Sequence, residues 1–509
     1  MGWFVFAVAA VVYCLTIESS ASFWDCPEFI TTGYKLEVGH PPGAPFFMLT
    51  ANLFSQFASD PSQVAYMVNV MSALLSAGCI LFLFWSITHL TRRLICGNST
   101  TIKAGQMVTI FGAGLVGALA YTFSDTFWYS AVEGEVYAYS SFFTAVVFWF
   151  ILKWEEEAGS VHSDRWLILI AYMMGLSVGV HLLNLLCIPA IVLIYYYKKR
   201  PEADWKGTLM ALLVSVVLIA AILYGIVPGI VKVGGWFELL FVNTFSMPFN
   251  TGLIIYIVVL VGTLVWSIWE THAAASKLRT NISFIAVVAL TGLPFYGHGV
   301  TCVLLGLIVL GALAVYLFNL DKVKEQWRIS ARVMSTALVS ILMIVVGYSS
   351  YAVIVVRSAA NTPMDQNSPE DIFTLGSYLN REQYGDTPLF YGGTYASKVA
   401  RKVEGQYLVP VVKEGAKVYM PKEKAKADEK DRYFVVRTKK EYVMEPSMLF
   451  PRMHSADHAN WSGVNLYDSW VGGIKGREAV VNVGGQKQKV KVPTQLDNIK
   501  FFINYQVNF

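Results

Sequence analysis

Long blocks of apolar residues, separated by short polar segments, dominate the first 356 residues of the chain. Within these blocks the hydrophobic positions surround the whole helix instead of forming one stripe, which is typical of helices buried in lipid or in a bundle. Several blocks are shorter than the roughly 20 residues of a full crossing, so we expect tilted helices, local thinning of the bilayer or an adjoining aqueous cavity. The pattern predicts eleven candidate membrane spans, at Trp3–Ile17, Val64–Leu90, Met107–Phe123, Ala138–Leu152, Trp166–Val180, Leu182–Tyr197, Leu209–Val231, Thr251–Trp269, Phe284–Phe295, Val300–Phe318 and Val333–Val356.

The pattern changes after residue 356. Alternation typical of strands occurs in "YLVPVV", "RYFVVRT" and "EAVVNVGGQKQKVKV", the last with a Gly-Gly hairpin signal. We therefore expect a transmembrane domain over residues 1–356 and a soluble α+β or β-rich domain over 357–509, with the lysine-rich "KEKAKADEKD" as a solvated loop. Because the chain stops at the apolar-aromatic run "FFINYQVNF", we expect the soluble domain to be truncated and a further segment to follow.

Composition agrees with a polytopic membrane protein. Of the 509 residues, 55% are hydrophobic and only 15% are charged, which is too apolar for a soluble protein of this size. No basic stripe with interleaved aromatic residues is present, so nucleic acid is not predicted as a partner. No Cys/His cluster has the spacing of a zinc site, so no metal site is predicted.

The distribution of Lys and Arg predicts the orientation in the membrane. With the N-terminus inside, the outer loops hold only Lys35 and Lys232. The inner loops then hold fifteen basic residues, namely Arg92, Arg93, Lys103, Lys153, Arg165, Lys198, Lys199, Arg200, Lys206, Lys277, Arg279, Lys322, Lys324, Arg328 and Arg332. This bias predicts a cytoplasmic N-terminus and an extracytoplasmic soluble domain.

Acidic residues collect instead in the outer loops. The first outer loop, residues 18–62, contains "FWDCPEF" and then "EVGHPPGAP" before an apolar helix begins. A simple connection would be shorter, so we expect short helices lying along the membrane. Asp25 and Glu28 can be read as the N-cap and third residue of a capping box. Beside Trp24 at the interface they can equally be partly desolvated carboxylates, which is how a general base is prepared.

A second acidic and aromatic segment, "SDTFWYSAVEGEVYAYS", falls between the third and fourth predicted spans. Glu133 and Glu135 lie there beside Tyr137. Sugars are commonly held by this mixture, because aromatic rings stack on their C–H faces and carboxylates accept hydroxyl hydrogen bonds. The alternative is an interfacial aromatic belt with solvated acids.

Four stretches together resemble a known family. They are "ESSASFWDCPEFITTGYKLEVGHPPGAP", "FWYSAVEGEVYAYS", "GLSVGVHLLNLL" and "RSAANTPMDQNSPEDIFTLGSYLNREQYGD". They look like the Bacteroidota membrane family built on domain of unknown function 2723, which is related to the protein O-mannosyltransferases of the GT-C glycosyltransferase superfamily. The resemblance covers essentially the whole chain. It departs from the protein O-mannosyltransferase pattern in one respect, because Asp25 and Glu28 are not an adjacent Asp-Glu pair.

The resemblance implies a glycosyltransferase of the bacterial inner membrane. Such an enzyme would move a sugar, mannose or a similar hexose, from a polyprenyl-phosphate donor to Ser or Thr hydroxyls of exported proteins at the periplasmic face, with inversion. Asp25 is then the expected base, with Glu28 sharing that role or orienting the acceptor. We expect the remaining site residues to bind substrate, namely Trp24, His40, Glu133, Glu135, Tyr137, His181 and Arg357.

Arg357 follows the last predicted span and is the expected partner of the departing phosphate, although it can also be an ordinary interfacial anchor. The competing function classes are a transporter of lipid-linked glycans and a non-catalytic assembly factor. Transporters place ionisable groups near the bilayer midplane, whereas the predicted spans contain essentially none. The sequence therefore favours chemistry at the membrane surface.

Overall fold

The structure is a computed structural model that describes residues 1–97, 99, 101–273, 276–325, 328–385, 388, 390–426, 428–451, 469–476, 478–483 and 486–507. The chain forms two compact units. The helical unit comprises Met1–Arg381 with Lys422–Tyr433, and the strand-rich unit comprises Glu382–Pro421 with Phe434–Phe509. Residues 357–381 pack within the helical unit, beyond the expected domain boundary after residue 356.

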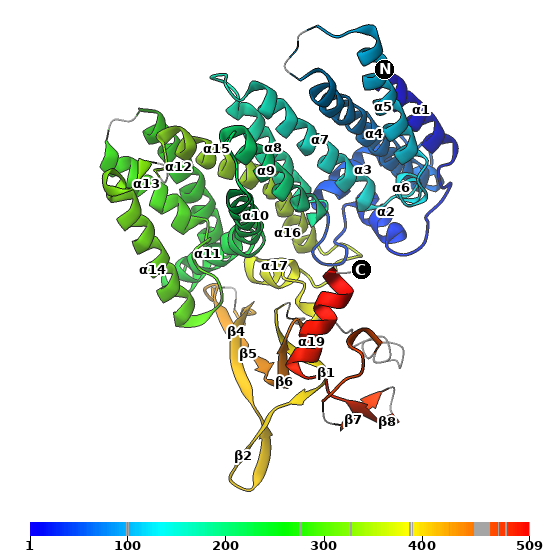
Figure 1. The fold of residues 1–509 in the computed structure, drawn as a ribbon. Helices are drawn as coiled ribbons and strands as arrows, with labels where there is room; N and C mark the ends of the chain where they lie inside the picture. Colours follow the sequence, from blue (N-terminus) through cyan, green and yellow to red (C-terminus); the bar gives the residue numbers. More distant parts are fainter. Residues whose placement is uncertain are drawn as a thin grey trace. The chain divides into compact units, whose positions relative to one another are not determined.

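The helical unit is a bundle of antiparallel helices joined by short connections (Figure 1). Its longer helices are α1 (Gly2–Leu15), α4 (Val64–Cys96), α5 (Ala104–Thr122), α7 (Val136–Glu157), α8 (Asp164–Val178), α9 (Ile188–Lys199), α10 (Trp205–Ala220), α11 (Val227–Leu239), α12 (Thr251–Ala273), α13 (Lys277–Leu290), α14 (Gly299–Phe318) and α15 (Ala331–Tyr348). Its short helices are α2 (Cys26–Lys35), α3 (Pro45–Ser55), α6 (Asp125–Ala131), α16 (Ala352–Ala359) and α17 (Ile372–Leu379).

Each predicted span overlaps a helical segment, but the count of eleven membrane spans is not confirmed. Eight helical segments among the described residues are long and apolar enough to cross a membrane, which supports a multi-pass membrane protein. Three predicted spans fall on shorter helices, because α1 and α13 have 14 residues each and α8 has 15. The predicted span Leu209–Val231 belongs to a continuous helical segment of 40 residues, Trp205–Thr244, in which the π-helical turns η3 (Ala221–Ile226) and η4 (Leu240–Thr244) interrupt the α-helix.

Small residues allow close packing between helices. A Cβ atom on Gly347 of α15 would lie 2.4 Å from the carbonyl carbon of Gly175 in α8, and one on Gly78 of α4 would lie 2.8 Å from the ring of Phe142 in α7. Small residues at helix contacts are usual in membrane bundles, where close backbone approach and dispersion drive association. The core of the bundle therefore excludes large side chains at these contacts.

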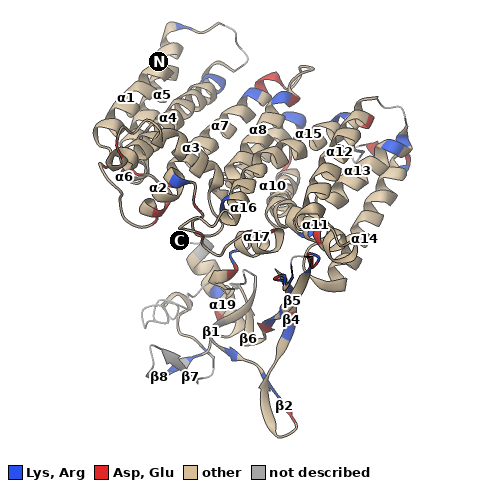
Figure 2. Ribbon diagram, turned by 180° about the vertical axis from the view of Figure 1, so that it is seen from behind, with Lys and Arg blue, Asp and Glu red and all other residues tan. Residues whose placement is uncertain are grey.

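Charged residues of the helical unit gather near helix ends, as Figure 2 shows. Several predicted inner-loop cations form ion pairs at one end of the bundle: Arg93 with Glu155 at 2.5 Å, Lys198 with Glu155 at 3.0 Å, and Arg332 with Asp164 at 2.5 Å. The clustering at one end agrees with the alternation of loops on which the orientation was predicted.

The first expected outer loop carries short helices, α2 and α3, followed by the 3-10 turn η1 (Pro61–Gln63). Within the helical unit, the end of the lysine-rich segment is anchored rather than fully solvated. Asp431 accepts a hydrogen bond from the Phe249 backbone N–H at 3.0 Å, and Tyr433 exchanges hydrogen bonds with the Asn243 side chain. The expectation of a solvated loop therefore holds for residues 422–426, whereas Asp431 at the end of the segment is half-buried and accepts a hydrogen bond through its side chain.

The strand-rich unit contains four two-stranded sheets, paired as β1–β6, β2–β3, β4–β5 and β7–β8 among its described residues. The strands are β1 (Tyr391–Val399), β2 (Arg401–Glu404), β3 (Tyr407–Pro410), β4 (Val412–Pro421), β5 (Tyr433–Tyr442), β6 (Met444–Leu449), β7 (Glu478–Val483) and β8 (Gln486–Lys491). The predicted strand-rich character is confirmed, and β7 and β8 pair antiparallel as the hairpin signal indicated. The Gly-Gly pair itself lies outside the described residues.

Candidate active site

Asp25 stands at the N-cap position of α2, yet its side chain makes no capping hydrogen bond. The side chain is 58% exposed, so this carboxylate faces solvent. Glu28, the expected third residue of a capping box, directs its carboxylate to His40 instead. The predicted helix start is therefore correct in position but not in hydrogen bonding. The Asp25 carboxylate is not buried by the protein, and its desolvation at a membrane interface stays a prediction.

His40 contacts α2 through hydrogen bonds to Glu28. Glu28 Oε1 accepts a hydrogen bond from the His40 backbone N–H at 2.5 Å and lies 2.9 Å from His40 Nδ1. On the other side of the imidazole, His40 Nε2 lies 4.0 Å from Asp25 Oδ2. The ring therefore sits between the two carboxylates of the first outer loop.

The contacts of His40 and Glu28 shift both acid–base equilibria. The hydrogen bond to Glu28 raises the pKa of His40 above its ordinary value, against the effect of burial. Burial alone would raise the pKa of Glu28, but hydrogen bonds donated by His40, the positive charge of His40 and a hydrogen bond donated by Gln366 together lower it. The structure thus favours an imidazolium–carboxylate pair.

Gly39 leaves room for this pair. A Cβ atom on Gly39 would lie only 2.7 Å from Glu28 Oε1. Any larger residue before His40 would therefore push the carboxylate away from its two hydrogen bonds, which accounts for a glycine in "EVGHPPG" on steric grounds.

The second acidic segment lies against the first. The pKa of the buried Cys26 thiol is raised to about 12, because burial acts together with the charges of Glu133 and Glu135 and a hydrogen bond to Glu133. Gly134 separates the two glutamates, and a Cβ atom on it would lie 2.9 Å from Ile30 of α2. The glycine of "VEGEV" therefore lets both carboxylates approach α2.

Glu135 is the most strongly shifted carboxyl group of this region. It is only 7% exposed and caps α7 by accepting a hydrogen bond from the Val136 N–H at 3.1 Å. Burial raises the pKa of Glu135 to about 7, the Val136 hydrogen bond opposes that rise, and the negative charges of Asp25 and Glu133 add to it. Glu135 can therefore exchange a proton near neutral pH, within the field of Asp25.

Tyr137 and His181 form the next contact along α7. Their ring centroids lie 5.4 Å apart, and His181 Nδ1 accepts a hydrogen bond from the Leu183 N–H at 3.2 Å. Burial lowers the pKa of His181, and the positive charge of Arg381 lowers it further. Arg381 also acts to lower the pKa of His40. The positive charge of Arg381 therefore acts on both histidines, which the sequence did not indicate.

The segment after α16 holds the first outer loop in place. The Val38 N–H donates to the Met364 carbonyl at 2.9 Å, and the Gln366 N–H donates to the Val38 carbonyl at 3.1 Å. The Tyr378 hydroxyl donates to the Gly39 carbonyl at 2.6 Å. The backbone beside His40 is thus fixed by residues more than three hundred positions away in the sequence.

Arg357 contacts the opposite end of α2. Its Nε donates to the Leu36 carbonyl at 2.6 Å and its NH2 group to the Lys35 carbonyl at 3.2 Å. Cations at a helix C-terminus satisfy the last carbonyls and stabilise the helix dipole. Arg357 therefore supports α2, and its predicted contact with a departing phosphate stays a prediction.

Trp24 precedes Asp25 in a left-handed backbone conformation, with φ of 62°. Its side chain is 96% exposed and that of the preceding Phe23 is 83% exposed. A non-glycine residue with positive φ is uncommon and marks a tightly determined turn. The structure places this aromatic pair at the entrance to α2, next to the exposed carboxylate.

The structure thus brings together residues that the sequence distributes over separate segments. Asp25, Glu28 and His40 are in direct or near contact, and the charges of Asp25, Glu133 and His40 act on the buried Glu135. The sequence analysis did not identify Asn69, which is fully buried in α4 and donates to the Glu18 and Ser20 carbonyls. The one indication in the sequence was an asparagine inside an apolar span. Among the described residues, no group of three or more His, Cys, Asp or Glu side chains is arranged to hold a metal ion.

Comparisons with known proteins bear on the same region. Residues 25–204 match the family model described as the protein O-mannosyl-transferase TMEM260 N-terminal domain, and residues 385–503 match a family of unknown function, DUF8416. Protein O-mannosyl-transferase TMEM260 of Mus musculus is 29% identical over 199 residues, which are 38% of this chain and 26% of that protein. The Dictyostelium discoideum protein of the same name is 24% identical over 227 residues, 42% of this chain and 25% of that protein.

The chain therefore spans about a quarter of the length of these curated relatives. Asp25, Glu28, His40, Glu133 and Glu135 together form the acidic cluster. The matched range begins at Asp25 and includes all five of these residues, whereas Arg357 and Arg381 follow it. The matches support an O-mannosyltransferase-like family for this part of the chain.

Proposed function

We propose that the chain is a membrane glycosyltransferase that moves a hexose, mannose or a similar sugar, from a polyprenyl-phosphate donor to Ser or Thr hydroxyls of exported proteins. One observation carries this proposal: two acidic segments from different loops converge with His40 at one end of an apolar bundle. The family model described as the protein O-mannosyl-transferase TMEM260 N-terminal domain covers the same residues. A lipid-anchored donor would present its sugar at this membrane surface.

The proposed reaction is an inverting transfer of GT-C type. The hydroxyl oxygen of the acceptor attacks the anomeric carbon, the bond from that carbon to the phosphate oxygen breaks, and polyprenyl phosphate leaves. Asp25 takes the hydroxyl proton, because its exposed carboxylate neither caps α2 nor forms a short ion pair. His40 lies within reach of Asp25 and is held by Glu28. The Glu28–His40 pair therefore orients the base and offers positive charge.

The remaining residues bind the two substrates. Glu133 and Glu135 accept hydrogen bonds from sugar hydroxyls, and Trp24 offers an exposed ring face to the sugar or to the acceptor. The leaving phosphate needs hydrogen-bond donors and positive charge. The positive charge of Arg381, which acts on His40 and His181, would stabilise the leaving phosphate electrostatically. The guanidinium of Arg357 donates to the Leu36 carbonyl at the end of α2.

The proposal includes an orientation. Eleven spans, a cytoplasmic N-terminus and a periplasmic strand-rich unit would place the acidic cluster on the outer face of a bacterial inner membrane. The predicted bias of basic residues and the ion pairs near Glu155 and Asp164 at the opposite end of the bundle support this orientation.

The full chain, purified in lipid nanodiscs, tests the activity. With a polyprenyl-phosphate mannose and a Ser/Thr-rich exported protein, we expect a hexose mass to appear on the acceptor. Its appearance must require the lipid-linked donor and not a nucleotide sugar. Movement of the donor across a vesicle membrane, without any acceptor modification, would indicate a transporter and contradict the proposal.

A further inference from the structure

The peptide group that joins Gly39 to His40 is hydrogen-bonded at both ends. Its N–H, which belongs to His40, donates to Glu28 Oε1 at 2.5 Å. Its carbonyl, which belongs to Gly39, accepts from the Tyr378 hydroxyl at 2.6 Å. The Tyr378 hydroxyl also lies 3.4 Å from the His40 carbonyl oxygen. Tyr378 therefore contacts the backbone of the residue whose side chain faces Asp25.

These hydrogen bonds form a continuous chain that ends beside the proposed base. The Tyr378 hydroxyl donates to the Gly39 carbonyl, the N–H of the same peptide group donates to Glu28, and Glu28 Oε1 lies 2.9 Å from His40 Nδ1. The far nitrogen of that imidazole, Nε2, lies 4.0 Å from Asp25 Oδ2. Hydrogen bonds in series polarise one another, so a donor to the carbonyl strengthens donation by the N–H. Loss of the first bond should therefore weaken the hydrogen bonding between Glu28 and His40.

Tyr378 reaches the loop from a rigid support. Its side chain lies in α17 and is only 1% exposed. The Asp371 side chain caps this helix by accepting from the N–H groups of Phe373 and Thr374, at 2.8 and 2.9 Å. The helix also packs closely on α11, because a Cβ atom on Gly235 would lie 3.0 Å from the Phe373 ring. The position of the hydroxyl is therefore set by the packing of α17.

The loop is shaped to receive this hydroxyl. Gly43 has φ of 69°, a conformation that favours glycine, and a Cβ atom on it would lie only 2.7 Å from Tyr378 Oη. The Gly43 N–H donates to the His40 carbonyl at 2.8 Å, which closes a turn. The two glycines of "GHPPG" therefore make room for different partners, Gly39 for the Glu28 carboxylate and Gly43 for the Tyr378 hydroxyl.

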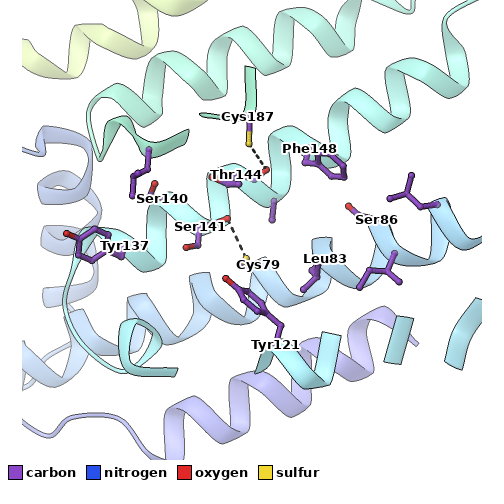
Figure 3. Close-up of a pocket in the computed structure, with 14 residues that line it drawn as sticks. Cys79, Leu83, Ser86, Tyr121, Tyr137, Ser140, Ser141, Thr144, Phe148 and Cys187 are labelled. Atoms are coloured by element: carbon purple, nitrogen blue, oxygen red, sulfur yellow. Dashed lines mark hydrogen bonds between the residues drawn. The ribbon is translucent and has the colours of Figure 1, made fainter. Parts of the chain in front are cut away.

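Side-chain donors to backbone carbonyls also occur inside the bundle. Figure 3 shows two of them in the wall of a cavity between α4, α5 and α7, where the thiols of Cys79 and Cys187 donate to the carbonyls of Ser141 and Thr144 at 3.4 and 3.9 Å. Those carbonyls belong to the continuous helix α7, whose own hydrogen bonds already fix their positions. The Gly39 carbonyl lies outside any helix, so its donor helps to decide where the loop lies.

We propose that Tyr378 is a positioning residue of the candidate active site, because its hydroxyl fixes the Gly39–His40 peptide group so that Glu28 holds the imidazole toward Asp25. Tyr378 is buried and contacts neither substrate, so it acts through the loop. The inference rests on the proposed function for the reaction that it assists, but the state of the imidazole can be measured without that reaction.

Tyr378→Phe removes only the hydroxyl and provides the kinetic test. Tyr256→Phe is the matched control, since Tyr256 of α12 is fully buried and its hydroxyl donates to the Leu290 carbonyl at 2.7 Å. Both variants should lose a similar amount of Tm. Tyr378→Phe should lower kcat for hexose transfer roughly five- to ten-fold with KM within about two-fold, and Tyr256→Phe should leave both within about two-fold. Unchanged kcat in Tyr378→Phe, or an equal loss in the control, would overturn the inference.

A double variant separates action through Glu28 from an independent effect. Once Glu28→Gln has weakened the contact with His40, the Tyr378 hydroxyl should matter less. The kcat of the double variant Glu28→Gln with Tyr378→Phe should therefore lie within about two-fold of that of Glu28→Gln alone. If the two losses multiply in full, Tyr378 acts by another route and the inference is wrong.

The ionisation of His40 gives a readout that needs no turnover. NMR of ¹³C-labelled histidine in the full chain in nanodiscs follows the imidazole through a pH titration, and His40→Gln identifies its signal. The hydrogen bond to Glu28 raises the pKa of His40. The charges of Asp25 and Arg381 also act on this imidazole, and neither tyrosine substitution removes them.

Tyr378→Phe should lower the pKa of His40 toward its ordinary value, with a roughly three- to ten-fold larger acid dissociation constant, whereas Tyr256→Phe should match wild type. An identical His40 titration in wild type and Tyr378→Phe would overturn the inference even if kcat falls. A wild-type protein that transfers no hexose from any lipid-linked donor would contradict the proposed function instead, and this titration would still decide whether Tyr378 positions His40.

Discussion

Glu28 Oε1 binds His40 twice, at 2.5 Å from its backbone nitrogen and 2.9 Å from Nδ1 of its ring. The single carboxylate oxygen thereby fixes both the loop and the imidazole, with Nε2 left to face Asp25 at 4.0 Å. The carboxylate that a capping box would have used for α2 instead positions a cationic side chain beside the proposed base.

The Glu28–His40 pair should stabilise the fold within a limited pH window. Because the pKa of His40 is raised, its contribution to stability is complete at pH values below its ordinary pKa of about 6.5 and is lost as pH rises through the raised pKa. The lowered pKa of Glu28 gives stability that is present above about 4.5 and lost as pH falls through the lowered value. Glu28→Gln should therefore lower Tm most near pH 6, where it should reduce the free energy of unfolding by about 1 kcal/mol.

Differential scanning fluorimetry of wild type and Glu28→Gln across pH 5 to 9 measures this window. The difference in Tm should shrink at the alkaline end, where His40 is neutral. A difference that stays constant over the whole range would show that the pair is not ionised.

Glu135 should make the folded protein sensitive to pH on the alkaline side. Because burial raises its pKa to about 7, wild type must hold a buried charge above that pH, which costs stability as pH rises from about 4.5 through 7. Glu135→Gln removes this cost. At about pH 8 the variant should have a higher Tm than wild type and a free energy of unfolding larger by roughly 1–3 kcal/mol, whereas at about pH 5 the two proteins should be equally stable.

The same variant should weaken sugar binding if the Glu135 carboxylate accepts a donor hydroxyl. The KM of wild type for donor should then fall as pH rises through about 7, and Glu135→Gln should lose that dependence. A pH profile of KM identical in both proteins would remove Glu135 from the donor site.

We expect substitution of Arg381 to affect catalysis and substitution of Arg357 to affect stability. Arg381→Ala should raise the KM for lipid-linked donor and lower kcat, since a charged hydrogen bond to the leaving phosphate is worth about 1.5–3 kcal/mol. Arg357→Ala should mainly lower Tm, because it removes two hydrogen bonds from the C-terminal carbonyls of α2. If Arg357→Ala loses turnover at unchanged Tm, the sequence-based assignment to the phosphate holds and Arg381 is not required.

Labelling of introduced cysteines tests the proposed orientation. A membrane-impermeant maleimide applied from outside should modify cysteines placed near Asp25 and near Gly393, and should leave those near Arg93 and Lys199 unmodified until the membrane is opened. Labelling near Arg93 from outside would contradict the number of spans and reverse the predicted face of the acidic cluster.

The apolar pattern was sufficient to locate the helices, since each predicted span has a helical counterpart, and the alternation after residue 400 located strands β3, β5, β7 and β8. It could not show how long a helix continues. Local propensity lets the segment from Trp205 run to Thr244, well past the apolar block that ended at Val231.

The site was predictable only in part. Asp25, Glu28 and His40 belong to the same outer loop, so the sequence could assign them to one region, but their contacts became visible only in the structure. The positions of Arg381, Gln366 and Tyr378 depend on a strand-like pairing between Val38 and Asp365, which no local pattern reveals. Arg357 was assigned from its distance to a span, whereas its partners are carbonyls of a helix more than three hundred residues earlier. Long-range hydrogen bonds therefore decide where the Arg357 guanidinium lies.

Asp25→Asn tests the central claim most directly. Asparagine matches aspartate in size and is an equally good N-cap, and the Asp25 side chain makes no capping bond in the first place, so the variant should fold with nearly unchanged Tm. Purified full chain, long polyprenyl-phosphate mannose and an acceptor protein give the rate of hexose transfer by mass spectrometry. We expect kcat to fall roughly 10²–10⁴-fold, as for loss of a general base. Full transfer activity in a well-folded Asp25→Asn protein would contradict the assignment of Asp25 as the base.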